Sequence, residues 1–488
     1  MSWPNSNNFS VIVVLPASGC EMIAKVLRCR TWLMNLLFVT TMFLAESVRK
    51  ARIIQSATFY MVWTKPRVFS VPGTVAPIRH QSNQMTRLKR AISMPMLLFF
   101  GLGNILGAGI YVLIGKVAAE SAIYAPVAFL CASLVAGFSA FTYAELSSRY
   151  PHSAGEAVYI QQGFGQTWIS RIVGLLIALA GMVSAATVSR GFHGYFSVFL
   201  SLDAALVISG IVLLLGGLTV WGVRQSVGAA ALLTVAEIIG LAVVIWAGRD
   251  LLASVPMRMP ELLPPANLSV WTGIGLGAFI AFFAFIGFED MVNVAEEVKN
   301  PARNLPLAIL LALIIATVMY ALVSIVAVLA LPLAQLSTST APLTDVLAQL
   351  ANYDARYISA ISMLAIVNGA LIQMVMASRL LYGMACKGWL PDALSRVNAK
   401  TRTPVNATLL VVAIILALAL WLPVQTLAIA TSYIVLIVFS MVNAALLALR
   451  LREGRATEGW SVPIWVPLFG LLSSAALIVF ELVQRWAA

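Results

Sequence analysis

Residues 101–110 read GLGNILGAGI, with four glycines and one asparagine inside an apolar run from about residue 91 to residue 118. A run of this length can cross a bilayer as a helix. A glycine costs roughly 1 kcal/mol against alanine in a helix interior, and a backbone group freed in hydrocarbon costs several kcal/mol more. Unwound backbone persists at membrane depth only where it faces protein or a water-filled cavity. The stretch therefore predicts either a polar ligand site at a helix break or a close helix-packing seam.

The composition is that of a polytopic membrane protein. Of the 488 residues, 61% are hydrophobic and 10% are charged, and the mean hydropathy is +0.93. Soluble domains carry about 25% charged residues. Residues 1–90 hold 12 Lys and Arg against 2 Asp and Glu, which leaves 19 against 17 for the remainder, so no nucleic-acid-binding surface is indicated. The four cysteines show neither metal-ligand spacing nor a disulfide framework.

The N-terminal region, residues 1–84, shows no spanning run and no helical or strand period. Its apolar segment 32–45 is too short to span and lacks a small-residue cleavage site, which argues against a signal peptide. Met85 then precedes a basic flank, TRLKR at 86–90, typical of the cytoplasmic side of a first spanning helix. We expect residues 1–84 to be a dispensable or mis-called extension, with a short membrane-surface anchor as the alternative.

The apolar runs after Met85 predict eleven spanning helices. They lie at about 92–118, 124–149, 167–192, 203–221, 227–248, 271–296, 304–331, 354–386, 405–422, 424–449 and 463–486. When the first helix starts inside, most Lys and Arg fall on the inner loops and helix ends, which places the N-terminus in the cytoplasm. Residues 85–450 would then form a ten-helix core, and residues 451–488 a cytoplasmic loop and an eleventh helix.

The sixth predicted helix repeats the irregularity of the first. Residues 271–288 are apolar and rich in glycine, and Glu289 and Asp290 then place two carboxylates near membrane depth. The second irregular stretch comes five helices after the first, and this odd spacing makes the second copy enter from the opposite side of the membrane. The pattern predicts an inverted five-helix repeat with the ligand site between the two broken helices.

These stretches resemble the amino acid–polyamine–organocation transporters, a superfamily with the leucine-transporter fold. The strongest matches are GNILGAGI at 103–110 and FAFIGFE at 283–289. Further matches are TYAEL at 142–146, PHSAGE at 151–156, AEEVKNP at 295–301, KGWLP at 387–391 and Thr403-Pro404. The cationic amino acid transporter branch is the most similar. The sequence departs from the family in its N-terminal extension and in having eleven helices where twelve are common.

The resemblance implies an all-α membrane protein with a 5+5 inverted repeat, broken helices one and six, and one additional C-terminal helix. It also implies a substrate site made of main-chain groups. The residues concerned are Ile105, Gly107, Ala108, Gly109, Phe283 and Ile286. The N–H groups of 107–109 would bind an α-carboxylate, and the remaining carbonyls an α-ammonium, so no buried full charge is needed. Phe283 and Phe285 would be gating aromatics, although a buried Phe is ordinarily core.

Four acidic residues in or near the predicted helices are candidates for coupling or gating. Glu289 is either functional or a hydrogen-bonded strut between the second break and helix one. Glu237 stands alone in helix five, where some proton-coupled relatives carry a lysine. As a buried carboxyl group it is either a proton carrier or a neutral residue paired with the backbone. For Glu145 and Asp290 we expect partly solvated charges at a gate or interface.

The sequence thus predicts an amino acid permease that works by alternating access, with proton-coupled uptake and with exchange as the alternative. A channel would need repeated carbonyl or charge rings, and an enzyme a catalytic set, and the sequence shows neither. Small and apolar candidates on helices three, eight and ten favour neutral substrates. The expected partners are an amino acid, protons and the lipid bilayer, with no catalytic residue, cofactor, metal ion or nucleic acid. The expected location is a cell membrane, most simply a bacterial inner membrane.

Overall fold

The computed structural model describes residues 90, 92–107, 109–152, 155–221, 226–351, 355–398, 401, 403–455 and 459–487. Within these ranges the chain forms helices and turns, with one isolated bridge between Ile92 and Val298. Contacts place the described residues up to Ile478 in one unit and those from Val479 onward outside it. The predicted extension, residues 1–84, lies outside the described residues, and so does Ala108.

The first span breaks at the predicted stretch. Helix α2 covers Met94–Leu106 and helix α3 covers Gly109–Ser121, and Gly107 lies in a turn after α2. A single 3₁₀ turn, η1 (Ala122–Tyr124), then leads into α4, Ala125–Arg149. The glycine-rich stretch therefore contains the end of one described helix and the start of the next.

The sixth span breaks in a similar way. Helix α10, Leu268–Phe282, passes into a 3₁₀ turn, η3 (Phe283–Phe285), and the chain continues as a longer 3₁₀ helix, η4 (Glu289–Glu297). Gly287, between them, has φ +129°. Side chains strain the backbone in that region. A Cβ at this position would also lie 2.9 Å from the backbone of Asn104, so glycine allows the two breaks to meet.

The remaining α-helices are α5 (Gly155–Phe164), α6 (Thr167–Phe196), α7 (Ala204–Trp221), α8 (Ser226–Ala247), α9 (Arg249–Leu262), α11 (Pro301–Ala330), α12 (Leu333–Thr338), α13 (Pro342–Ala351), α14 (Ala355–Cys386), α15 (Val405–Trp421), α16 (Val424–Glu453) and α17 (Trp465–Ala487), with a 3₁₀ turn η5 at Asp392–Ser395. Proline marks the start of two of the spanning helices. Pro301 begins α11, and Pro126 lies in the first turn of α4. Proline is tolerated there because the first N–H groups of a helix have no acceptor within it.

Eight helical stretches among the described residues are long and apolar enough to cross a membrane, or nine if α8 and α9, bent by 60°, count as one span. One of the eight runs for 56 residues from Met94 to Arg149. That is about 84 Å of helix, which must cross a bilayer of about 30 Å twice. This stretch therefore counts as two spans. When the bent pair α8 and α9 and the apolar 17-residue helix α15 are added, each of the eleven predicted spans corresponds to a helix or to a broken helix.

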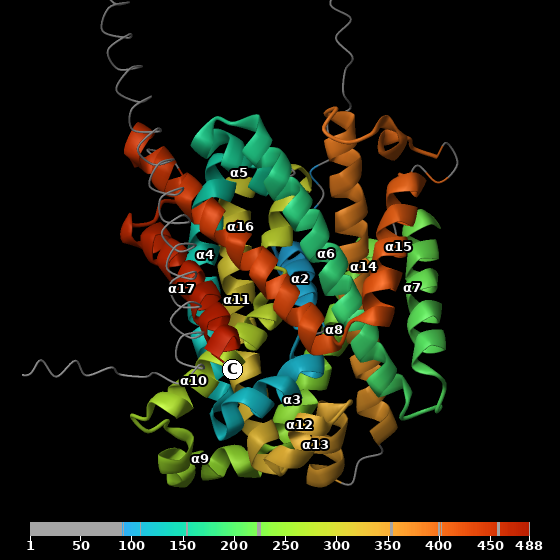
Figure 1. The fold of residues 1–488 in the computed structure, drawn as a ribbon, viewed down its shortest axis with the longest axis vertical. Helices are drawn as coiled ribbons and strands as arrows, with labels where there is room; N and C mark the ends of the chain where they lie inside the picture. Colours follow the sequence, from blue (N-terminus) through green and yellow to red (C-terminus); the bar gives the residue numbers. More distant parts are fainter. Residues whose placement is uncertain are drawn as a thin grey trace, which may run out of the picture. The chain divides into compact units, whose positions relative to one another are not determined.

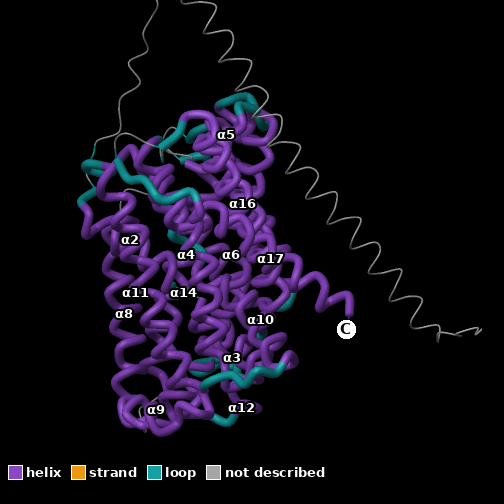
Figure 2. The backbone as a smooth tube through the Cα atoms, turned by 90° about the vertical axis from the view of Figure 1, so that its left-hand side faces the viewer, coloured by secondary structure: helices purple, strands orange, loops and turns teal. Residues whose placement is uncertain are grey.

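The broken helices lie inside the bundle formed by residues up to Ile478. Helix α2 packs against α8 and α11, α11 runs along α4, and α14 runs along α6. Figure 1 shows α2 in the middle of this arrangement, with α5 at one end and with α9, α12 and α13 at the other. Figure 2 shows the same two ends from the side. We call them the α5 end and the α9 end, and the two helix breaks lie between them.

Candidate functional site

The two helix breaks line a small cavity in the middle of the bundle. The lining residues are Asn104, Ile105, Gly109, Ser184, Val188, Phe283, Ile286, Gly369 and Gln373. Four of the six residues predicted to bind substrate are among them. Gly107 is not in the lining, and Ala108 lies outside the described residues. The cavity offers about 20 Å³ of space for water. One water molecule needs about 10–15 Å³ on this measure, so the breaks are closed upon each other.

The glycines of the first break allow neighbouring backbone to approach closely. A Cβ on Gly109 would collide with Cα and Cβ of Ala284 in η3, and one on Gly107 would lie 3.3 Å from the carbonyl oxygen of Ala365 in α14. Gly109 also begins α3, and the first N–H groups of a helix have no acceptor within it. Because Gly109 lines the cavity, these N–H groups are available to an anion there.

Tyr320, from α11, joins the two breaks. Its hydroxyl oxygen lies 2.6 Å from the carbonyl oxygen of Ile105 and 2.9 Å from that of Ala284, so one donor is shared by both unwound turns. The ring of Phe285 packs edge-on against Tyr320, with 5.2 Å between the centroids. Phe285 therefore lies in the core beside this bridge, whereas Phe283 lines the cavity. Sequence analysis did not single out Tyr320, which stands as one tyrosine in an apolar run.

Asn104 ties the first helix to the second break. Its amide nitrogen donates to the carbonyl of Gly287 at 2.9 Å and to Asp290 Oδ2 at 2.6 Å. Gln373, from α14, donates to the same Asp290 oxygen at 2.7 Å and to Asn104 Oδ1 at 3.3 Å. Asp290 is thus buried, and the expectation of partial solvation was wrong. Glu289 accepts from the N–H of Gly287 in its own turn at 2.8 Å, so the strut to helix one is Asp290.

Glu237 is completely buried on α8. Its Oε1 accepts from the amide of Asn368 in α14 at 2.9 Å, and the hydroxyl of Tyr111 donates to its main-chain oxygen at 3.0 Å. Glu237 Oε2 and Asn368 Oδ1 have no hydrogen-bond partner among the described atoms. Helix α2 reaches this group as well, since a Cβ on Gly103 would lie 2.9 Å from the Asn368 amide. Glu237 therefore contacts the broken helix through Asn368, outside the cavity lining.

Glu145, on α4, is the centre of a buried ion-pair network. Its Oε2 accepts from Arg450 at 2.7 Å and from the N–H of Val462 at 2.9 Å, and its Oε1 lies 2.6 Å from Arg149 Nη2. Arg450 also donates to Ser461 Oγ and to the carbonyl of Val462, at 2.7 and 2.6 Å. The expectation of a partly solvated Glu145 was wrong. The network fastens α4 to α16 and to the segment before α17, away from the cavity.

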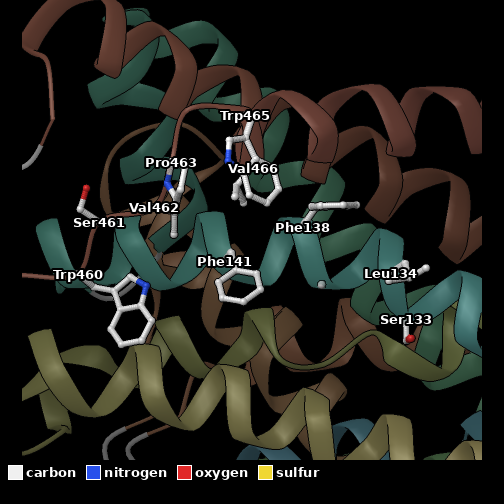
Figure 3. Close-up of a pocket in the computed structure, with 11 residues that line it drawn as sticks. Ser133, Leu134, Phe138, Phe141, Trp460, Ser461, Val462, Pro463, Trp465 and Val466 are labelled. Carbon is white, nitrogen blue, oxygen red and sulfur yellow. The ribbon is translucent and has the colours of Figure 1, made fainter.

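A larger hollow, of about 410 Å³, lies between α4 and the start of α17. Figure 3 shows the rings of Phe138, Phe141, Trp460 and Trp465 around it. None of the predicted substrate residues lines this hollow. Leu134 and Trp465 on its rim are 64% and 52% exposed, as expected of side chains that face lipid. The small cavity between the broken helices therefore remains the candidate substrate site. The described residues contain no group of three or more His, Cys, Asp or Glu placed to hold a metal ion.

Comparison with known proteins places this architecture in a family. Residues 92–485 match the model of a family described as amino acid permease. The chain belongs to the amino acid permease family. It is therefore a multi-pass membrane protein, in agreement with its long apolar helices. Permeases of this family are transporters and not enzymes, which agrees with the sequence prediction.

Relatives of this permease carry several transport names. It is 32% identical over 390 residues to "cationic amino acid transporter 3, mitochondrial" of Arabidopsis thaliana, a match that covers 75% of this chain and 63% of that protein. It is 28% identical over 417 residues to the branched-chain amino acid permease BcaP of Bacillus subtilis, with 80% of this chain and 88% of that protein covered. The chain thus spans less than two thirds of the Arabidopsis relative.

The fold of the permease is also found in a solved structure. MhsT in complex with L-phenylalanine superposes with a TM-score of 0.58 at 12% sequence identity, over 81% of this chain and 99% of that one. At this identity the likeness concerns the fold alone. It confirms the leucine-transporter fold that the resemblance implied.

Proposed function

We propose that this permease carries amino acids across a cell membrane by alternating access, driven by proton symport. The observation that carries the proposal is the closed cavity between two helix breaks in the middle of the bundle. Transporters of this fold place their substrate between the broken helices. Because the cavity has room for little more than one water molecule, an amino acid enters only when the breaks separate toward one side. Family membership supports the same class of substrate.

The amino acid would be held mainly by main-chain groups. The N–H groups of residues 107–109 bind its carboxylate, and the carbonyls of Ile105, Phe283 and Ile286 face its ammonium group. The side chain would then lie against Ser184, Val188 and Gly369, which line the same cavity. No charged side chain is in that lining. An ionic substrate side chain would therefore lack a direct partner in the closed site, and the lining favours a small neutral amino acid.

The positive residues support a cytoplasmic α5 end. The described helix ends and loops on the side of α5 are the starts of α2, α6 and α11 and the ends of α4, α14 and α16, and they carry Arg90, Arg149, Arg171, Lys299, Arg303, Lys387, Arg396, Arg450, Arg452 and Arg455. The opposite helix ends and α9 carry Lys116, Arg190, Arg249, Arg258 and Arg356. Lys and Arg gather on the cytoplasmic side of membrane proteins, so ten against five favours a cytoplasmic α5 end.

Glu237 is the proposed proton carrier. None of the ion pairs among the described residues includes it, and its second oxygen lacks a hydrogen-bond partner. An ionised carboxylate buried without a cation costs several kcal/mol, so the closed state favours the neutral acid. Opening toward water would hydrate the carboxyl group and release the proton. Binding of the proton at Glu237 and closure around the substrate are thereby coupled through Asn368 and α2.

The proposal is tested with purified protein in liposomes and a panel of radiolabelled amino acids. Glu237→Gln fixes the neutral form, so counterflow exchange should persist while uptake against a gradient, driven by an imposed pH difference, is lost. Glu261→Gln is the matched control, because Glu261 is exposed on α9 beside Arg258 and should leave both activities intact. Accumulation by Glu237→Gln at the wild-type level would refute the assignment. A wild-type protein that exchanges but never accumulates would be an exchanger.

A further inference from the structure

A second small cavity lies next to the substrate site on the side of α5. Its lining residues are Tyr143, Glu156, Ile177, Ala180, Gly181, Ile286, Glu289, Asp290, Gln373, Val435, Val438 and Phe439. It shares Ile286 and Gln373 with the substrate cavity, so the two are neighbours. It offers about 20 Å³ of space for water, enough for one water molecule.

Three carboxyl groups line this cavity, and no Lys, Arg or His does. Glu156, Glu289 and Asp290 are 1%, 7% and 5% exposed. Like charges repel strongly in a protein interior, where the effective dielectric constant is far below that of water. Buried carboxylates that share a site therefore do not all ionise, and at least one of them holds a proton. The polar contacts show which one.

Hydrogen bonds favour a negative charge on Asp290 and a proton on Glu156. Asp290 accepts from two amides, Asn104 at 2.6 Å and Gln373 at 2.7 Å, which stabilise its charged form. Glu289 accepts one backbone N–H, from Gly287. Glu156 Oε1 and the hydroxyl of Tyr143 are fully buried and make no hydrogen bond of good geometry in the described part of the chain, although both line the cavity and the hydroxyl is near enough to lower the pKa of Glu156. A water molecule between them would satisfy both.

The surroundings of Glu156 hold no compensating cation. Glu289 and Asp290 face it from η4, Tyr143 from α4 and Tyr159 from its own helix, while α6, α14 and α16 present only uncharged groups to the cavity. Helix α5 is a short helix between two spans. Burial, and then the charge of Asp290, raise the pKa of Glu156 to about 8.

We propose that Glu156, together with Tyr143 and one water molecule in this cavity, forms a second proton site that opens to the cytoplasm and is distinct from Glu237. The proposal rests on the transport function and on the cytoplasmic α5 end argued above. Glu156 belongs to α5, whereas its acidic neighbours belong to η4, which continues the broken sixth helix. Opening at the α5 end separates α5 from η4 and admits water. The carboxyl group then loses its proton to the cytoplasm, and it must take one up again before the site closes.

This order of events fixes the sign of the pH dependence. The closed state holds the proton more tightly than the open, hydrated state, in which the carboxyl group returns toward its ordinary pKa. The contribution of this proton to closure is therefore complete at low pH and is lost as the pH on the α5 side rises to about 8, the pKa of Glu156 in the closed state. Within that window the equilibrium constant for closure falls by up to tenfold for each pH unit, and above about 8 it falls no further. The exchange rate of the wild-type protein should therefore fall as the pH on the α5 side rises from 6 to 8 and should level off between 8 and 9. The pH on the α9 side should not produce this effect.

The experiment measures counterflow exchange in liposomes with uniformly oriented protein, at α5-side pH values from 6 to 9 and constant pH on the other side. Glu156→Gln should keep exchanging, with the fall between pH 6 and 8 abolished. Glu453→Gln, which removes an exposed carboxylate at the same end, should keep the wild-type profile. Tyr143→Phe keeps the carboxyl group but removes a hydroxyl that can donate to its charged form, so the midpoint should move to higher pH.

The outcomes separate the second proton site from the transport function. If the wild-type protein moves no amino acid at all, the proposed function fails. If it exchanges, but Glu156→Gln keeps the wild-type fall between pH 6 and 8, the second proton site is refuted. If Glu156→Gln does not fold, Tyr143→Phe decides: a shifted midpoint supports the site and an unshifted midpoint refutes it.

Discussion

Removal of one hydroxyl group at Tyr320 should loosen the whole substrate site. In Tyr320→Phe the carbonyls of Ile105 and Ala284 lose the donor that lies 2.6 and 2.9 Å from them, and both stay buried. A buried polar group left without its partner costs about 1–3 kcal/mol. A value of about 2 kcal/mol, acting on the state in which the two breaks meet, lowers the equilibrium constant for forming that state roughly 30-fold.

The measurement is the equilibrium affinity for the transported amino acid, determined with purified protein in detergent together with its thermal unfolding. We expect the apparent dissociation constant to rise more than twofold and by up to roughly 30-fold, because affinity is reduced by the fraction of molecules with an assembled site. Tyr159→Phe is the matched control. Its hydroxyl is also buried, but it has no hydrogen-bond partner among the described residues, so affinity and stability should stay within twofold of wild type.

The bridge between the breaks would be refuted by a Tyr320→Phe protein that unfolds at a lower temperature but binds with unchanged affinity. Tyr320 would then stabilise the fold without organising the site. Equal affinity changes in Tyr320→Phe and Tyr159→Phe would also refute the argument, since the second substitution breaks no hydrogen bond in the described structure.

The remaining predictions concern the first break and the network at the α5 end. Gly109→Val should abolish substrate binding while the protein still inserts, because its side chain collides with Ala284; Gly210→Val, where a Cβ meets nothing within 4 Å, should bind normally. Wild-type affinity in Gly109→Val would disprove this placement. Glu145→Ala should destabilise the protein by about 3–5 kcal/mol in denaturant titrations, because Arg450 stays buried without its carboxylate. Glu145→Met combined with Arg450→Met should recover most of that loss, and no recovery would contradict an ion-pair origin.

The helix breaks were predictable because their causes are local. Glycines and an asparagine inside an apolar run are costly in a spanning helix, so residues 101–110 indicated a break without any knowledge of neighbouring helices. The same reasoning found the second break at Gly287, together with the acidic pair that follows it. Two facts could be learned only from the fold: Gly107 is outside the cavity lining, and Ser184, Val188 and Gly369 belong to it. Which residues face the cavity depends on how the helices pack.

The polar contacts were not predictable because their partners lie far along the chain. Asn104 and Asp290 are 186 positions apart, and Glu145 meets Arg450 across 305 positions. Hydropathy describes only the local surroundings of a residue, so Glu145 near a helix end suggested solvation. The carboxylate is instead covered by two other segments. Tyr320 was missed for the same reason, since nothing near it in sequence indicates the carbonyls that its hydroxyl approaches.

The hydrogen bonds of Asn104 are shared unequally between its neighbours. Two of them join α2 to the second break, while the hydrogen bonds described between α14 and this pair come from the amide of Gln373. If α2 and η4 rotate together, both Asn104 bonds remain and only those of Gln373 are lost. At about 1 kcal/mol for each of these two bonds, the separation costs roughly 2 kcal/mol. Thermal motion alone then supplies a few per cent of molecules with Gln373 released, before any substrate has arrived.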